Sequence, residues 1–433
     1  MKMKHTTFIY ALALLLAVQG TLSTPVSAEP VTVDSETLQR LENLISSQQK
    51  QLESLQEEVN QLKQQKIQQP AVSGTGQGPA AAPPAKLVTS GDDKVKLSIS
   101  GQINRALSIA DDGDKTDAYF VDSDVSNTRV RFVGTALINE DLTLGTKLEL
   151  AFAPNESGDV NQESQESGDF NDQRYAELTL MSKRYGMLYL GKGDTSSNST
   201  AEVDLSGTDL IQYASTADIV GGLFFRQSSD DELLDGEDGR PRVRVSDAFK
   251  DFDGLSRKSR LRYDTPNFHG FGLSGSVISD RRWDTALRWG GDGYGVKAAA
   301  AAAVAYLHED DADYQYDGSF SVLHEATGLN VTFSAGTKDA DNQTDPYNLW
   351  GKIGWLTSLN SFGKTAFGID YGHSENIAAE DYEGDTFGVA VVQNFDKWAT
   401  QVYFQFRNFS LDTNDDPNVS DINVGTLGAR VKF

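Results

Sequence analysis

The sequence from Lys94 to Phe433 alternates apolar and polar residues with a period of two, and this pattern limits the fold more than any other feature. In the first segment the apolar parity holds Val95, Leu97, Ile99 and Ile103. Successive side chains of a β-strand point to opposite faces, so each such segment predicts a strand with one apolar and one polar face. A soluble β-sandwich would alternate in the same way, so the pattern alone does not place the apolar faces outside.

The number and spacing of these segments favour a closed barrel. Sixteen strands are expected to begin near Val95, Asn127, Asp141, Gln173, Gly186, Ser259, Gly270, Arg282, Gly293, Tyr314, Gly328, Tyr347, Gly363, Tyr382, Lys397 and Ile422. Tight turns, among them 139–140 and 290–292, alternate with longer acidic loops such as 155–172. An outer-membrane barrel requires an even number of strands, with short turns at one rim and long loops at the other. We therefore predict an all-β fold, a 16-stranded antiparallel transmembrane β-barrel, over residues 95–433.

The N-terminus has the features of an export signal. Lys2 and Lys4 precede an apolar run from Phe8 to Val18, and small residues end at Ala28, so residues 1–28 are expected to be a cleaved signal peptide. The apolar run is too short to span a bilayer. No later run is long enough for a spanning helix, so the exported chain can cross a membrane only as a closed barrel.

Composition excludes several classes of protein. The formal net charge of -25 opposes binding to nucleic acid. The chain has no cysteine, and it therefore has neither a disulfide framework nor a thiolate metal site. Its five histidines include no pair with helical ligand spacing, and no catalytic motif appears, so we expect neither a transition-metal site nor an enzyme.

Residues 29–69 carry a different pattern, with apolar residues spaced alternately three and four apart. The predicted core positions are Leu38, Leu41, Ile45, Leu52, Leu55, Val59 and Leu62. This is a heptad seam, and it favours a short α-helical coiled coil on the periplasmic side over a single amphipathic helix lying on a surface. Residues 70–94 are rich in Gly, Ala and Pro and predict a flexible or partly extended linker.

Several segments of the barrel region resemble the general trimeric porins of the Gram-negative outer membrane. They are SISGQINRAL (98–107), NTRVRFVG (127–134), LYLGKGDTS (188–196), SRLRYDTPNFHGF (259–271) and the closing GARVKF. The resemblance implies a homotrimer that forms a water-filled channel for passive diffusion of small hydrophilic solutes and ions. A chain that ends on Phe433, at the close of an amphipathic strand, also resembles proteins that carry the assembly signal of bacterial outer-membrane barrels.

The resemblance also implies a constriction loop that folds into the barrel, here residues 194–257. Its acidic side is expected to hold Glu202, Asp204, Asp209 and Asp218. The opposing basic wall is expected to hold Arg129, Arg131, Arg174, Arg260, Arg262 and Lys147, which include residues of the polar parity. Opposed charges across a narrow watery gap orient dipolar solutes. The alternative is that these arginines only solvate the lumen and pair with nearby acids. The charged stretch 230–244 has no role in either interpretation.

Other functions and partners stay open at this point. The channel could be selective for anions such as phosphate, or the barrel could anchor a structural tether whose coiled coil binds peptidoglycan. Calcium at acidic loops is a further candidate, at Asp111, Asp112 and Asp114 or at Asp412, Asn414 and Asp416, although Pro417 replaces the glycine of a calcium loop. Divalent cations could also bridge such loops to lipopolysaccharide.

Overall fold

The computed structural model describes residues 88–91, 94–167, 172–234, 242–308, 312–340, 344–413 and 418–433. The predicted signal peptide, the coiled coil and most of the linker lie outside these residues. Within the described part of the chain, none of the helices has the length and apolar character needed to span a bilayer.

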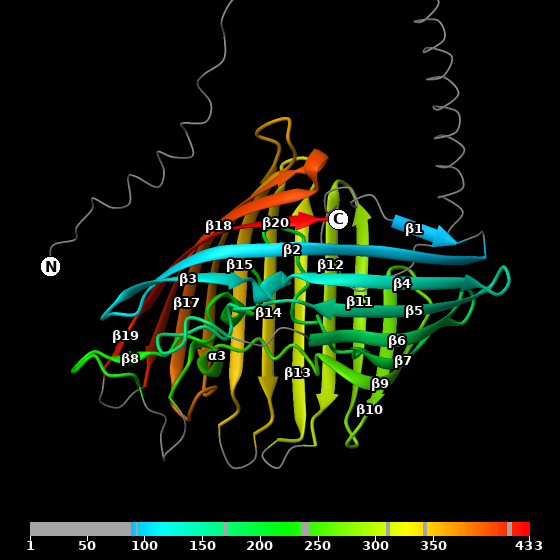
Figure 1. Ribbon diagram of the computed structural model, residues 1–433. Helices are drawn as coiled ribbons and strands as arrows, with labels where there is room; N and C mark the ends of the chain where they lie inside the picture. The colour runs from blue at the N-terminus through cyan, green and yellow to red at the C-terminus, as the bar shows by residue number, and fades with distance from the viewer. Residues whose placement is uncertain are drawn as a thin grey trace, which may run out of the picture. The chain divides into compact units, whose positions relative to one another are not determined.

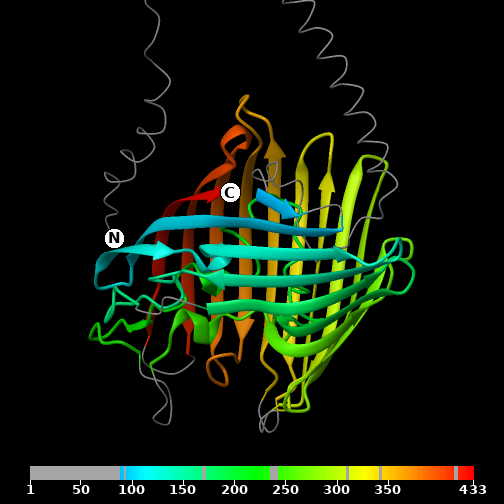
Figure 2. The same ribbon diagram turned by 45° about the vertical axis from the view of Figure 1, so that its right-hand side comes forward.

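Sixteen long strands of the described chain form one antiparallel barrel (Figures 1 and 2). They are β2 (Val95–Asp111), β4 (Arg129–Leu137), β5 (Leu142–Ala151), β6 (Asp172–Ser182), β7 (Gly186–Asp194), β9 (Arg257–Asp264), β10 (Phe271–Ile278), β11 (Trp283–Gly293), β12 (Val296–Tyr306), β13 (Tyr314–His324), β14 (Leu329–Lys338), β15 (Tyr347–Thr357), β16 (Thr365–Glu375), β17 (Glu383–Phe395), β18 (Thr400–Asp412) and β20 (Ile422–Lys432). Consecutive strands pair with one another, and β2 closes the ring by pairing with both β4 and β20. The predicted 16-stranded barrel is confirmed.

The apolar faces of the strands point outward. Along β2, Val95 and Ile103 are 57% and 53% exposed, whereas Asn104 and Ser108 on the opposite parity are fully buried. A soluble sandwich would bury the apolar parity, so this arrangement excludes it. An outward apolar band over a polar interior is the arrangement that lets a barrel lie in lipid with all backbone groups paired.

Local geometry corrects one sequence prediction. The turn expected at 290–292 lies inside β11, and the chain turns instead at Tyr294 and Gly295, whose φ angles are 54° and 77°. Two consecutive residues with positive φ form the tight turn that suits the twist of a hairpin. Within the predicted linker, residues Val88–Gly91 form a short strand, β1, which pairs with β2. The loop after β2 also holds a short strand, β3 (Thr116–Asp122), which pairs with β2.

Two aromatic contacts close the seam where the first and last strands meet. The Tyr403 ring lies against Gly428, where an added Cβ would approach the hydroxyl to 2.4 Å, and the hydroxyl donates to Asn104 Oδ1 at 2.8 Å. Phe433 pairs with Gly101 through both backbone groups, at 2.8 and 3.0 Å, and its ring covers that glycine. Both glycines therefore give room for an aromatic ring at the seam.

Candidate channel constriction

The connection from β7 to β9 runs along the inner wall of the barrel, held by hydroxyl groups of the strands. Ser196 N–H donates to Ser276 Oγ at 2.7 Å. Further along, Val203 N–H donates to Ser319 Oγ at 2.8 Å and Leu205 N–H to Ser321 Oγ at 2.9 Å. These bonds satisfy backbone groups that have no strand partner. The first half of the loop is therefore fixed to β10 and β13.

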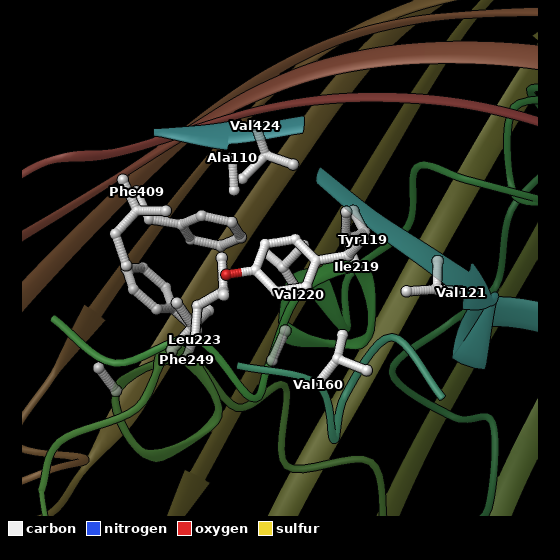
Figure 3. Close-up of a cluster of buried hydrophobic side chains, with 14 of the residues drawn as sticks. Ala110, Tyr119, Val121, Val160, Ile219, Val220, Leu223, Phe249, Phe409 and Val424 are labelled. Carbon is white, nitrogen blue, oxygen red and sulfur yellow. The ribbon is translucent and has the colours of Figure 1, made fainter. Parts of the chain in front are cut away.

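The rest of the loop forms a hydrophobic core inside the barrel mouth. It contains η3 (Thr216–Ile219) and α3 (Val245–Ala248). Figure 3 shows loop side chains directed toward inward-facing residues of the wall; the loop contributes Ile219, Val220, Leu223 and Phe249, and the wall Ala110, Val424 and Phe409. The rings of Phe249 and Phe409 are 5.1 Å apart. This core occupies the side of the lumen next to β2, β18 and β20.

The described residues of the charged stretch, 230–234 and 242–244, contribute to this core. Leu234 and Val243 are buried, and their backbones are joined by a hydrogen bond that Val243 N–H donates to Leu234 O at 2.9 Å. Arg242 pairs with Glu163, and the Arg244 guanidinium lies 5.1 Å from the Phe224 ring. Nearby, β8 (Arg226–Gln227) pairs with β19 (Val419–Ser420). The described part of this stretch thus contacts neighbouring loops at the mouth.

The basic wall is built around one buried carboxylate. Glu149 on β5 is fully buried, and it binds Arg131 Nε at 2.5 Å, Arg174 Nε at 2.9 Å and Arg129 Nη1 at 3.7 Å. Three guanidinium groups share one carboxylate, so this cluster keeps a formal charge of +2. The Arg131 side chain is 36% exposed and the other two are 18% and 13% exposed. This excess positive charge therefore faces the lumen.

The other predicted basic residues are placed differently. Arg260 pairs with Glu177 at 2.6 Å, and Arg262 binds both oxygens of Asp264, at 2.7 and 2.9 Å. These two side chains are 1% and 3% exposed, and their charges are compensated. Lys147 Nζ lies 3.1 Å from the centre of the Tyr175 ring. Arg260 and Arg262 thus follow the alternative interpretation, in which arginines pair with nearby acids.

The four predicted acids of the loop differ in their exposure to the lumen. Asp204 is buried in an ion pair with Lys352 of β15 and does not face the lumen as an unpaired acid. Asp209 is exposed, and Glu202 and Asp218 are partly exposed. Asp218 accepts hydrogen bonds from the Tyr213 hydroxyl and from Ser215 Oγ.

Three of these acids have raised pKa values. Desolvation by the enclosing barrel raises the pKa of Glu202 well above its usual range, and Asp253, Asp251 and Asp218 raise it further. Desolvation likewise raises the pKa of Asp209 and of Asp218. Each of the three keeps some accessible surface, so the lumen still hydrates it in part.

Bases of the wall lie close enough to the acids of the loop to act on them electrostatically. Arg430 and Lys432 of β20 act electrostatically on Asp209, and Arg257 and Arg174 act on Asp218. None of the ion pairs in the described part of the chain joins these groups directly, so a gap separates them. Opposed charges across such a gap produce a transverse field.

Sequence reasoning missed Arg430, Lys432 and Lys352 as site residues. Arg430 donates to Gln401 Oε1 and to Ser126 Oγ, and no carboxylate pairs with it among the described residues. The signal was present, because Arg430 and Lys432 both lie on the polar parity of the last strand. The packing of the loop against β15 and β20, which the sequence does not show, gives these residues their importance.

The calcium hypothesis concerns residues that are only partly described. Asp112 is engaged with Arg226 Nε at 2.7 Å and with Gln162 Nε2 at 3.0 Å. In the described ranges no group of three or more His, Cys, Asp or Glu side chains could hold a metal ion. Asn414 and Asp416 lie outside those ranges, so calcium binding there stays a prediction.

Replacing Gly336 by valine should displace the loop and increase single-channel conductance. Gly336 faces the lumen on β14, and an added Cβ would meet Asp251 O at 2.4 Å and Phe252 Cβ at 2.8 Å. The control is Gly272→Val on β10, since an added Cβ there meets nothing within 4 Å. Conductance in planar bilayers checks the prediction, and equal conductance of the two variants would contradict it.

The fold and the site together define a transmembrane barrel channel with a charged constriction. The family model of Gram-negative porins matches residues 72–426, and the chain belongs to that family. None of the curated proteins matches the sequence.

Solved structures share the fold at low sequence identity. An anion-selective porin from Comamonas acidovorans is 15% identical, with a TM-score of 0.54 over 78% of this chain and 100% of its own. OmpT, an outer membrane protein of Vibrio cholerae, is 14% identical, with a TM-score of 0.53 over 81% of this chain and 100% of its own. The outer membrane channel DcaP of Acinetobacter baumannii is 12% identical, with a TM-score of 0.50 over 79% and 99%. The protein is therefore an outer-membrane porin that forms a passive channel.

Proposed function

We propose that this porin is a water-filled channel for small hydrophilic solutes and ions with a moderate preference for anions. The observation that carries this proposal is the charge imbalance at the constriction. Six basic side chains, Arg129, Arg131, Arg174, Lys147, Arg430 and Lys432, line one side. The acids that act on them are the shared Glu149, the exposed Asp209, and Asp194 and Glu177, and the last two are paired with Arg257 and Arg260. An excess of fixed positive charge in a narrow pore favours anions.

The reversal potential of the purified porin in a potassium chloride gradient tests this proposal. An anion preference is expected because permeant chloride is concentrated beside the uncompensated guanidinium groups. A cation preference would overturn the charge assignment while leaving the channel itself established. The same recording tests the phosphate-selective alternative, since that reading requires phosphate to block chloride current.

Lowering the pH from about 7 to about 5 should increase the anion preference. Glu202, Asp209 and Asp218 have raised pKa values and so lose their negative charge at a higher pH than ordinary carboxyls do. The arginines stay charged over the same range, and the net charge of the constriction becomes more positive. Reversal potentials recorded as a function of pH check this expectation. The triple variant Glu202→Gln, Asp209→Asn, Asp218→Asn should show a flatter profile, and an equal pH dependence would contradict the assignment.

We infer that the porin assembles as a homotrimer through the outer face around β2 and β3. The Arg105 side chain emerges there with 42% exposure, near the outward side chains of Ile103 and Phe120. It donates to Pro154 O at 2.9 Å and lies 3.5 Å from Asp122. An arginine on a lipid-facing strand costs up to about 2–4 kcal/mol, so contact with a second subunit is favoured over lipid. Conductance in groups of three equal steps supports a trimer, and single steps alone would oppose it.

The remaining partners are proposals that the sequence motivates. The heptads of residues 29–69 favour a coiled coil that strengthens the trimer or binds peptidoglycan, and lipopolysaccharide is proposed to bind at the acidic outer rim through divalent cations. Deleting residues 36–69 should leave conductance intact. A loss of conductance in that variant would oppose an accessory role for the coiled coil.

A further inference from the structure

Lys352 on β15 is a cation buried beneath the constriction loop. Its side chain has no exposed surface, and its ammonium group binds the Asp204 carboxylate, whose side chain is 4% exposed. Nζ also donates to Thr208 Oγ1 at 2.9 Å and to Gln212 O at 2.7 Å. An ammonium has three donors, and here all three are used on one short segment of the loop.

The three acceptors lie on both sides of Asp209 in the sequence. Within this segment, Gln212 N–H donates to Thr208 O at 2.8 Å, and Ser206 N–H donates to Asp204 Oδ1 at 2.7 Å. Leu210 and Ile211 are buried, whereas Asp209 is the exposed residue of the segment. The segment is thus tied to one lysine and presents one acid to the lumen.

We propose that Lys352 is a positioning residue for ion selectivity, which acts by holding Asp209 opposite Arg430 and Lys432 without contacting the permeating solute. This inference rests on the proposed charge-asymmetric channel. Lys352 contributes little field of its own, because its charge is buried and compensated by Asp204. Lys352 therefore affects the lumen through the position in which it holds Asp209.

The sign of the expected effect separates positioning from direct charge. Replacing Lys352 by methionine removes a positive charge, so a direct electrostatic role predicts a weaker anion preference. Under the positioning role the segment leaves the wall, Asp209 no longer opposes the basic side, and the anion preference rises. The same rise is expected for Asp209→Asn, which removes the acid itself.

A double-mutant cycle on full-length porin in planar bilayers tests the proposal. We expect Lys352→Met and Asp209→Asn each to raise the chloride-to-potassium permeability ratio by roughly twofold, and the double variant to resemble either single variant. Independent effects that multiply, or a lower ratio in Lys352→Met, would overturn the positioning role.

Two further variants keep the result interpretable. Lys352→Met combined with Asp204→Leu removes the uncompensated buried carboxylate, and the raised ratio should persist in a barrel that folds as judged by heat-modifiable gel migration. Arg407→Met removes another fully buried wall cation, which binds Asp370 at 2.8 Å and Thr386 at 3.0 Å. It should not raise the ratio, and a rise would show a general effect of wall damage. If the native channel shows no anion preference, the proposed function fails, whereas a native preference that Lys352→Met leaves unchanged defeats only this inference.

Discussion

Replacing Arg129 and Arg131 together by serine is expected to remove most of the anion preference of the channel. The two arginines share Glu149 with Arg174, and the formal charge of that cluster falls from +2 to 0 when both are lost. A unit charge about 4 Å away contributes about 1 kcal/mol even in bulk water, so the permeability ratio should change by roughly fivefold. The reversal potential in a salt gradient measures this change.

The matched control removes the same charge outside the lumen. Arg281 and Arg282 lie on the turn between β10 and β11, where Arg282 is 3.4 Å from Asp280. Their double replacement by serine should leave the reversal potential unchanged, because salt screens charges beyond about 10 Å at 0.1 M ionic strength. If both double variants shift the potential equally, the wall arginines do not form the selective site.

Removal of Phe433 is expected to lower strongly the amount of folded barrel in the outer membrane. Phe433 makes the last backbone pair between β2 and the end of the chain, with hydrogen bonds of 2.8 and 3.0 Å to Gly101. Two such bonds contribute about 1–3 kcal/mol at the seam where the barrel closes. Heat-modifiable gel migration of outer-membrane fractions measures the folded fraction. Unchanged folding would contradict the role of Phe433 in assembly.

Gly101→Val should cause part of the same defect while leaving Phe433 in place. An added Cβ at Gly101 would lie 2.6 Å from the Phe433 ring and 2.8 Å from Arg129 O, so the ring loses its position. The control is Gly425→Val on β20, because an added Cβ there meets nothing within 4 Å. Equal folding of both glycine variants would show that the ring position is unimportant for closure.

The barrel was predictable because its pattern is local and repeated. Each strand shows its own alternation, and a shift by one residue would exchange its two faces. The signal therefore survives errors at strand ends, such as the turn at Tyr294 and Gly295, which was expected at 290–292. Outward apolar residues such as Val95 and Ile103 then resolved the one point that the pattern left open.

The constriction was predictable only in part. Parity indicated which arginines face inward, yet it gave no sign that Arg260 is compensated by Glu177, which lies two strands away on β6. Asp264, in contrast, lies two residues from Arg262 on the same face of β9, so that pair was visible in the sequence. The acidity of the loop was also visible, but the burial of Asp204 against Lys352 joins residues 148 positions apart.

The sequence by itself determined the sixteen strands, the apolar and polar face of each strand and the family of the protein. These properties depend on side-chain alternation along single strands, which any one segment displays. The tertiary structure alone decided which charges remain uncompensated in the lumen and where the constriction loop lies. Those depend on hydrogen bonds and ion pairs between distant residues, such as Lys352 with Asp204 and Ser319 with Val203, and only the closed barrel brings these groups together.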